Sequence, residues 1–316
     1  MLSILKHGVK LTFANFLGIL LNFVLTFLAT IGFYLAIALV VFGTLGAVSG
    51  IQFFTDFDFD LNQFDAVAGS IVSIPIIIIF VLYMIVLTIL QSMLIGGLYG
   101  STIESVFENR SSIGTYFVYS FRNLWRLTGL QFAILLLGIP VFAVMFFGNL
   151  LFAQVFGEEY IVIPIVLSVI IGLLFFTLFL HSPIFIVRLR VKVWRSIGLA
   201  FRLLMENPFR VLLSGVIFFG TILLIHALYL LFVGLPALIG YYLLEGMIST
   251  GLLNLLFGTY VFVISLIWGL CISPFSGVMS MLLLIRHYRQ HLHPLIEPME
   301  IDDNLYQGPL YQMKRN

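Results

Sequence analysis

Three histidines near the carboxyl end of the chain have the spacing of a metal site. His287, His291 and His293 follow an H-x3-H-x-H pattern, and the first two lie one helical turn apart, so that both could bind one metal ion. They directly follow a long apolar run, however, where amphipathic side chains commonly lie at the membrane interface. No cysteine or helical carboxylate stands at a spacing that would complete the ligand set. We therefore expect neither a metal nor another cofactor.

A second pattern with the look of a cation site is the segment DFDFD. It places Asp56, Asp58 and Asp60 at alternate positions, as at the start of a calcium-binding loop. Position six of such a loop requires Gly for a sharp turn, and position twelve requires a bidentate Glu. The chain has Leu61 and Val67 at these two positions. We interpret the segment as a solvated acidic hairpin.

Three polar side chains inside apolar runs could line a cavity or relay protons. These are His181, His226 and Gln131. A histidine in a membrane segment can also be a neutral imidazole that makes an interhelical hydrogen bond, and we favour this interpretation for both histidines. His226 lies deeper in its apolar run than His181 and is the better functional candidate. With Gln131 it would line a cavity for a neutral solute.

Ionisable side chains and catalytic motifs are missing from the apolar runs. An Asp, Lys or Arg at the centre of a bilayer costs about 2.5 to 3.5 kcal/mol, so that such a residue usually marks a proton or ion pathway. No Asp, Glu, Lys or Arg occurs in these runs, and the chain has no nucleophile elbow, Walker loop or HExxH motif. Because the catalytic motifs are missing, we predict no catalytic residues and no enzymatic activity. Because the ionisable residues are missing, the sequence also argues against an ion-coupled transporter.

The elements that position these side chains are predicted to be six transmembrane helices. Charged residues make up 9% of the chain, compared with about 25% in soluble domains. A helix of roughly 20 apolar residues crosses a bilayer core of about 30 Å, and strands with open edges would leave backbone groups unpaired in lipid. The qualifying runs are 16–49, 69–99, 127–152, 161–187, 211–236 and 255–285. The sequence thus predicts an all-α polytopic membrane protein without a soluble catalytic domain.

The first of these runs is longer than a membrane requires. At about 1.5 Å per residue it would reach about 51 Å. We expect it to tilt, to kink at Gly43, Gly46 and Gly50, or to extend past the membrane.

The positive charges predict the orientation of the chain. The 15 Lys and Arg residues fall into four clusters, at 6–10, 110–126, 188–210 and 286–315. Between the clusters lie acidic turns without a base: Asp56, Asp58, Asp60 and Asp65, then Glu158 and Glu159, then Glu245. Because loops rich in Lys and Arg stay on the cytoplasmic side, both termini are predicted to be cytoplasmic.

An internal repeat divides the chain into three units. Residues 112–126 (SIGTYFVYSFRNLWR) and 196–210 (SIGLAFRLLMENPFR) share Ser-Ile-Gly, an Asn nine residues after the Gly, and an Arg three residues later. A weaker first copy surrounds Gly8 and Asn15. The predicted units are about 1–99, 100–187 and 188–285, which form one transmembrane domain followed by a cytoplasmic tail, 286–316.

Each unit is predicted to open with a short interfacial helix, which we call an elbow helix. Helical projection of 191–206 places the charged residues on one face and most apolar residues opposite. Such a helix lies in the interface with its bases toward anionic headgroups, and Asn207-Pro208 would turn the chain into the next span. The predicted headgroup contacts of the elbow helices are Lys192, Arg195, Arg202, Arg210, Arg122 and Arg126.

The plan of six spans with elbow helices is similar to a known group of membrane proteins. Together with the A-F-x5-N-P-x-R element from Ala200 to Arg210, it resembles the six-helix membrane domain attached to some glycerophosphoryl diester phosphodiesterases, and related uncharacterised prokaryotic inner-membrane proteins. In those phosphodiesterases the chemistry belongs to a soluble barrel with catalytic His and Glu residues. Because this chain has no such barrel, the resemblance implies a multi-pass module in a prokaryotic cytoplasmic membrane and no phosphodiesterase activity.

These patterns favour a protein that works by contact and not by catalysis. The first hypothesis is a scaffold, accessory subunit or lipid-contacting module, with bilayer lipids, anionic cytoplasmic headgroups and other membrane subunits as partners. The alternative is a transporter or permease subunit for a neutral or amphipathic solute. A net charge of +1 gives no reason to expect a nucleic acid partner.

Overall fold

The protein consists of helices arranged as three hairpins. The computed structural model describes residues 2–54, 61–110, 112–157, 162–244 and 250–294, and these ranges contain no strand. Six helical stretches in them are long and apolar enough to cross a membrane. The prediction of an all-α, multi-pass membrane protein is therefore confirmed.

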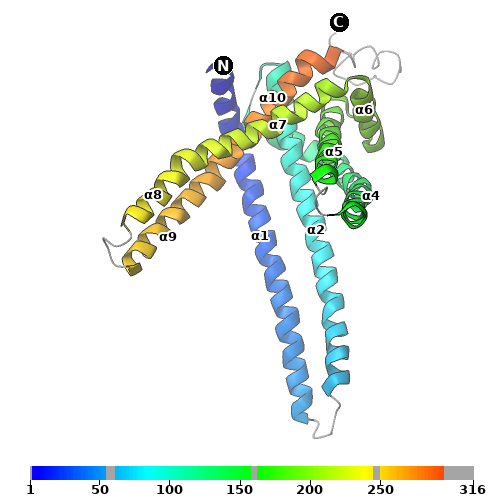
Figure 1. Ribbon diagram of the computed structural model, residues 1–316, viewed down its shortest axis with the longest axis vertical. Coiled ribbons are helices and arrows are strands. Elements are labelled where there is room, and N and C mark those ends of the chain that lie inside the picture. The colour runs from blue at the N-terminus through cyan, green and yellow to red at the C-terminus, as the bar shows by residue number, and fades with distance from the viewer. Residues whose placement is uncertain (1, 55–60, 111, 158–161, 245–249, 295–316) are drawn as a thin grey trace.

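The three hairpins meet at one end and diverge from it (Figure 1). The first hairpin is α1 (Leu2–Phe54) and α2 (Leu61–Phe107), and the second is α4 (Leu124–Phe156) and α5 (Val162–Leu189). The outgoing arm of the third is α7 (Pro208–Tyr229), the π-helical η2 (Leu230–Gly234) and α8 (Leu235–Leu244). Its returning arm is α9 (Thr250–Ile267), the π-helical η3 (Trp268–Ile272), α10 (Ser273–His287) and the π-helical η4 (Tyr288–Leu292). Two short helices, α3 (Ile113–Arg122) and α6 (Val193–Glu206), precede the second and third hairpins.

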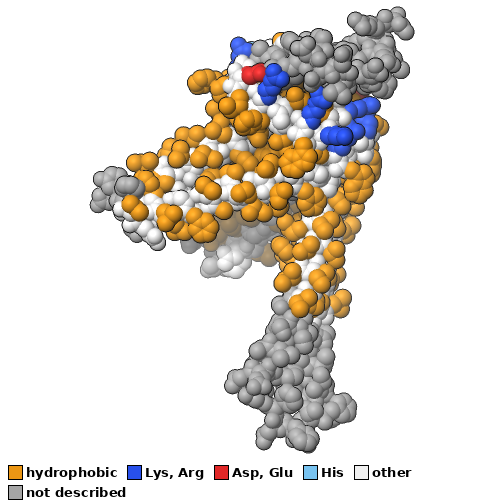
Figure 2. Space-filling model, turned by 90° about the vertical axis from the view of Figure 1, so that its right-hand side faces the viewer, with side chains coloured by type: hydrophobic (Ala, Val, Ile, Leu, Met, Phe, Trp, Pro, Cys, Tyr) orange, Lys and Arg blue, Asp and Glu red, His pale blue; other side chains and the backbone are white. Residues whose placement is uncertain are grey.

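The buried core lies where the hairpins meet. We call this the basic end, because α1 starts there, α10 ends there, and the Lys and Arg side chains gather there (Figure 2). Leu11 of α1, Ile184 of α5 and Leu282 of α10 are fully buried in one cluster. Farther along the hairpins the apolar side chains are mostly exposed, as in Leu39, Val144 and Phe262. Such surfaces suit hydrocarbon, because the helices satisfy their backbone groups internally.

Two glycines allow the short helix α3 to lie directly on α2. A Cβ at Gly97 would overlap the ring of Tyr116, and a Cβ at Gly100 would overlap the Cβ and ring of Tyr119. Small residues permit this kind of close approach between helices in membranes. The contact holds α3 at the basic end.

The first unit departs from the predicted plan. Residues 2–54 form one uninterrupted helix of 53 residues, so that no separate short helix precedes the first span. Asn15, the counterpart of the turning residue in the other two copies, is fully buried within this helix. No proline interrupts the segment around it. The long first run therefore extends as a helix past the length that a bilayer core requires.

The helix at the carboxyl end continues beyond the predicted tail boundary at 286. η4 prolongs α10 to Leu292, and both Tyr288 and Leu292 are fully buried. Because Arg289, Gln290 and His291 lie between these two apolar residues, the average hydropathy of the segment is low and does not indicate a buried helix end. Residues 295–316 lie outside the described residues, and so do the acidic turn residues Asp56, Asp58, Asp60, Glu158, Glu159 and Glu245.

Candidate functional site

The two short helices turn into their spans in the same way. The backbone N–H of Asn123 donates to the Tyr119 carbonyl at 3.3 Å, and the Asn123 carbonyl accepts from the N–H of Leu127 at 2.9 Å. At the second turn, Asn207 makes the same two kinds of bond, with lengths of 3.0 and 3.1 Å. The expected side-chain cap at Asn207 is absent. Backbone hydrogen bonds therefore stabilise the turn at Asn207. Pro208 at the first position of α7 is compatible with this turn, because an N–H at that position would have no intrahelical acceptor.

Helix α6 has two apolar faces, where the sequence predicted one. Ser196, Ile197, Ala200 and Leu203 are buried against the core. Trp194 and Phe201, which were predicted to lie on the same apolar face as Ile197, are exposed instead. The face of α6 that carries Ile197 and Ala200 thus packs against the protein core. The face that carries Trp194 and Phe201 is exposed and can contact an apolar environment outside the protein.

Exposed aromatic side chains mark both turns at the basic end. Trp125 is 75% exposed and Phe209 is 86% exposed, and each directly precedes an arginine. We call the exposed aromatic side chains of these two segments the aromatic rim; it consists of Phe121, Trp125, Trp194, Phe201 and Phe209. Trp is enriched where a membrane meets water, and Trp and Phe are common on the apolar face of helices that lie in this interface. The rim lies beside the bases of the same two segments, which is the pattern of an interfacial helix.

Two of the arginines that were predicted to contact lipid headgroups donate hydrogen bonds to backbone carbonyls at helix ends. Arg126 donates to the carbonyl of Arg190 at 2.6 Å, just after α5, and Arg210 donates to the carbonyl of His291 at 3.3 Å, in η4. A third arginine, Arg289, donates to a carbonyl in the last turn of α2. Carbonyls at helix ends lack intrahelical donors, and a cation there also complements the helix dipole. Arg126 and Arg210 therefore join the two arms of the second and of the third hairpin, and Arg289 joins the third hairpin to the first.

The other four predicted headgroup residues lie at the surface of the basic end or close to it. Arg202 forms an exposed ion pair with Glu206 at 2.9 Å, which adds little stability because both side chains are solvated. The guanidinium of Arg122 lies 4.1 Å from the centre of the Tyr119 ring. Lys192 is exposed directly before α6, and Arg195 is partly exposed in its first turn.

His181 makes an interhelical hydrogen bond at the core. Its Nδ1 lies 2.7 Å from the Thr177 carbonyl, and its Nε2 lies 3.0 Å from the hydroxyl oxygen of Ser214 on α7. Because a carbonyl can only accept, the neutral ring must donate from Nδ1 and accept at Nε2. The hydroxyl of Ser214 then shares its proton between this Nε2 and the carbonyl of Val211, which lies 2.6 Å away on its own helix, and both side chains are fully buried. This pair links α5 to α7 without access for a substrate.

The other two predicted cavity residues lie in different settings. His226 places Nδ1 2.8 Å from the Ile222 carbonyl of its own helix, and its ring meets that of Trp268 edge to face at 5.7 Å. Gln131 has a buried amide nitrogen without a hydrogen-bond partner in the described part of the chain. Neither residue lines the main cavity described below. The structure therefore does not bring the three polar side chains together.

Two of the three carboxyl-terminal histidines lie together, and the third contacts other residues. The rings of His287 and His291 lie 4.8 Å apart. Nε2 of His287 lies 3.1 Å from the carbonyl of Arg210, while His293 contacts the guanidinium of Arg188. Within residues 2–54, 61–110, 112–157, 162–244 and 250–294, no three His, Cys, Asp or Glu residues are grouped as a metal site would need.

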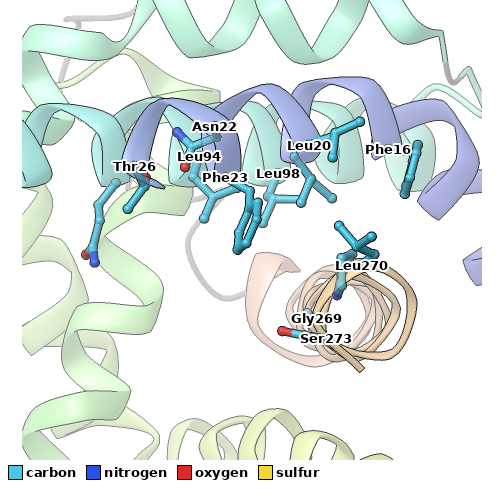
Figure 3. Close-up of a pocket in the computed structure, with 14 residues that line it drawn as sticks. Phe16, Leu20, Asn22, Phe23, Thr26, Leu94, Leu98, Gly269, Leu270 and Ser273 are labelled. Atoms are coloured by element: carbon cyan, nitrogen blue, oxygen red, sulfur yellow. The ribbon is translucent and has the colours of Figure 1, made fainter. Parts of the chain in front are cut away.

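A cavity of about 380 Å³ lies between the first and third hairpins (Figure 3). Its polar lining comes from α1, α2 and α10, and includes Asn22, Gln91 and Ser273. The signals in the sequence that could have predicted it are these polar residues within apolar runs, together with Gly269 and Pro274 in the sixth span. No family model, curated protein or solved structure matches this chain. Its function must therefore be argued from the basic end and the cavity.

Proposed function

We propose that this protein is a non-enzymatic, lipid-contacting membrane module whose basic end binds anionic headgroups. The observation that carries the proposal is the aromatic rim beside the bases of two equivalent turns. Trp125 and Phe209 stand 84 residues apart, the same spacing as the two copies of the Ser-Ile-Gly element at 112 and 196. Both are exposed next to an arginine. A repeated pair of this kind supports a surface selected for the membrane interface.

The physical basis is the combination of an apolar and an electrostatic contribution. Trp125 and Trp194 favour the headgroup region because the indole ring is largely apolar and carries one N–H donor. The phenyl rings of Phe121, Phe201 and Phe209 suit the acyl boundary just below it. Each Lys or Arg near an anionic leaflet contributes about 1 kcal/mol, and this attraction fades within a Debye length. Lys192 and Arg195 at the start of α6 meet this requirement, because Lys192 is exposed, Arg195 is partly exposed, and the exposed Trp194 of the aromatic rim lies between them in sequence.

The same proposal includes the orientation and the partners of the protein. Both ends of the described chain lie at the basic end (Figure 1), and the bias in Lys and Arg supports a cytoplasmic location for it. The units are then related copies, with α3 and α6 as elbow helices in a prokaryotic cytoplasmic membrane, as in the membrane domains that the sequence resembles. The long exposed flanks of the spans suit a scaffold or an accessory subunit for other membrane proteins.

Transport of a neutral or amphipathic solute is the second candidate function. The cavity between the first and third hairpins favours it, because transporters bind substrates near broken helices within the membrane. Neither His226 nor Gln131 lines this cavity. A solute would therefore pass along α1 and η3, and not beside these two residues as the sequence had predicted.

Removing charge from the start of α6 is expected to reduce selectivity for anionic lipid. In Lys192→Gln/Arg195→Gln, binding of phosphatidylglycerol should weaken about fivefold for each base, since about 1 kcal/mol per base is lost. Native mass spectrometry of protein released from nanodiscs of phosphatidylglycerol and phosphatidylcholine measures the bound ratio. A matched control is Lys192→Arg/Arg195→Lys, which changes both side chains at the same two positions and keeps both positive charges.

The two variants separate headgroup binding from general damage to α6. The control should keep the selectivity of the unaltered protein. Equal selectivity in all three proteins would contradict the proposal, because the bases of α6 would then make no energetically useful contact with lipid.

A further inference from the structure

The cavity at the crossing of the first and third hairpins has the size of a small-molecule site. Its volume of about 380 Å³ falls in the range of about 300 to 1,000 Å³ that is typical of ligand pockets. In Figure 3 the segment of α1 that carries Phe16, Phe23 and Thr26 passes beside the helix that carries Leu270 and Ser273. The walls therefore come from segments about 250 residues apart in sequence.

The lining of the cavity is apolar with a few uncharged polar groups. Side chains such as Phe16, Leu20 and Leu94 form most of it, and no Asp, Glu, Lys, Arg or His is among the lining residues. A charged ligand would lose its hydration there without meeting an opposite charge. Asn, Thr, Gln and Ser side chains can instead exchange hydrogen bonds with hydroxyl groups. The lining thus suits an uncharged molecule with a large apolar part.

The polar groups that α1 contributes lie toward one end of the cavity. Along α1, Asn22 and Thr26 lie at one end of the lining and Phe16 and Leu20 at the other, while Ser273 lies across the cavity beside Leu270 (Figure 3). Asn22 also donates to the carbonyl of Leu90 at 2.6 Å, next to the lining residue Gln91. The stretch from Phe16 to Thr26 rises about 15 Å, at about 1.5 Å per residue. This length is about half of a bilayer core. A cavity with this gradient fits one hydrocarbon chain with a small polar head.

The returning arm of the third hairpin is interrupted at this cavity. In η3 the N–H of Ser273 donates to the Trp268 carbonyl, five residues earlier. Pro274 has no N–H, so the carbonyl of Leu270 loses its α-helical donor. Both Leu270 and Pro274 line the cavity. π-helical segments are frequent at functional sites, and interrupted helices supply backbone groups to substrates inside membranes.

We propose that this cavity binds an uncharged amphiphile with a single hydrocarbon chain and a hydroxyl-bearing head group. The chain lies along Phe16 and Leu20, and the head reaches Asn22, Thr26 and Gln91. This site goes beyond the headgroup contacts of the basic end and does not depend on them. Loss of lipid selectivity at α6 would leave the binding of the amphiphile unchanged.

Saturable binding of tritiated oleyl alcohol to the full chain in phosphatidylcholine nanodiscs tests the proposal. The informative variant is Gly277→Leu, because Gly277 lines the cavity and a Cβ there meets no atom within 4 Å. The new side chain can therefore fill the cavity without displacing its walls. Gly258→Leu is the matched control, since a Cβ at Gly258 also meets nothing within 4 Å but this residue does not line the cavity.

The unaltered protein and Gly258→Leu should bind the alcohol equally, and Gly277→Leu should bind it at least tenfold more weakly. A second variant, Gln91→Leu/Thr26→Val, keeps the apolar walls and removes polar groups at the head end. It should bind the alcohol about 3- to 10-fold more weakly for each hydrogen bond that is lost.

Competition with molecules of the same chain type tests the class of ligand. Octadecene lacks the head and oleate carries a negative charge, so both should compete poorly with oleyl alcohol. Equal competition by octadecene would mean that the cavity accepts any hydrocarbon chain, and equal competition by oleate would contradict the exclusion of charge. Absence of saturable binding, or equal loss in both glycine variants, would also overturn the proposal.

Discussion

Gly100→Ala is expected to destabilise the protein, although the same substitution in most helices is stabilising. A Cβ at Gly100 of α2 would overlap the Cβ and ring of Tyr119 in α3. Since Cβ is fixed to the backbone, rotation of the Tyr119 side chain cannot relieve the overlap, and α3 must shift. Overpacking of this kind costs about 1 to 3 kcal/mol. Thermal unfolding in detergent, followed by size-exclusion chromatography of the remaining folded protein, measures the change.

Gly148→Ala is the matched control for this prediction. Gly148 lies in α4, and a Cβ there meets no atom within 4 Å. Alanine favours a helix over glycine by about 0.8 to 1.0 kcal/mol, so this variant should be more stable than the unaltered protein. The two substitutions thus have the same chemistry and opposite expected signs. Midpoints that shift in the same direction would show that α3 does not pack on Gly100 as described.

Ser214→Ala is expected to be more harmful than the double variant His181→Leu/Ser214→Ala. Removing the hydroxyl leaves Nε2 of the fully buried His181 without its donor, at a cost of about 1 to 3 kcal/mol. Replacing both partners by apolar groups removes the unsatisfied nitrogen as well. Replacement of both partners can be nearly neutral when shape is kept. The double variant should therefore regain part of the stability that the single variant loses.

A thermodynamic cycle of the four proteins measures this coupling between α5 and α7. Hydrogen bonds between membrane helices average about 0.6 kcal/mol and reach about 1.7 kcal/mol. Ser280→Ala is a suitable control, because this buried hydroxyl bonds to a carbonyl of its own helix at 2.9 Å. Additive effects of His181→Leu and Ser214→Ala would contradict a direct bond between the two side chains.

The helical spans could be predicted because hydrocarbon length is a local property. A run of apolar residues buries its backbone groups by forming a helix, whatever its neighbours are. Helix ends were less predictable. The run from Arg286 to Leu292 looks like a polar tail in sequence, but Tyr288 and Leu292 are buried by contacts with distant elements. Hydropathy averages over a window and cannot separate the two faces of such a turn.

The candidate cavity could not be predicted in the same way. His226 and Gln131 were chosen as polar residues in apolar runs, and Asn22 and Gln91 have the same sequence property. Only the two latter residues line the cavity. The side chain of Asn22 donates to the carbonyl of Leu90 at 2.6 Å, a contact 68 residues apart in the chain. Which polar residues share a cavity depends on such long-range pairings.

The sequence by itself determined that the chain is all-α, that it has six spans, and that its bases cluster at the ends of those spans, because each of these properties depends on local composition. The tertiary structure alone decided the roles of the individual bases. Arg126 and Arg210 occupy equivalent repeat positions and were predicted to bind headgroups, yet each donates to a carbonyl 64 or 81 residues away. A guanidinium can bind a phosphate or a helix end equally well. Only the packing of the two arms of a hairpin brings the helix end within reach of the arginine.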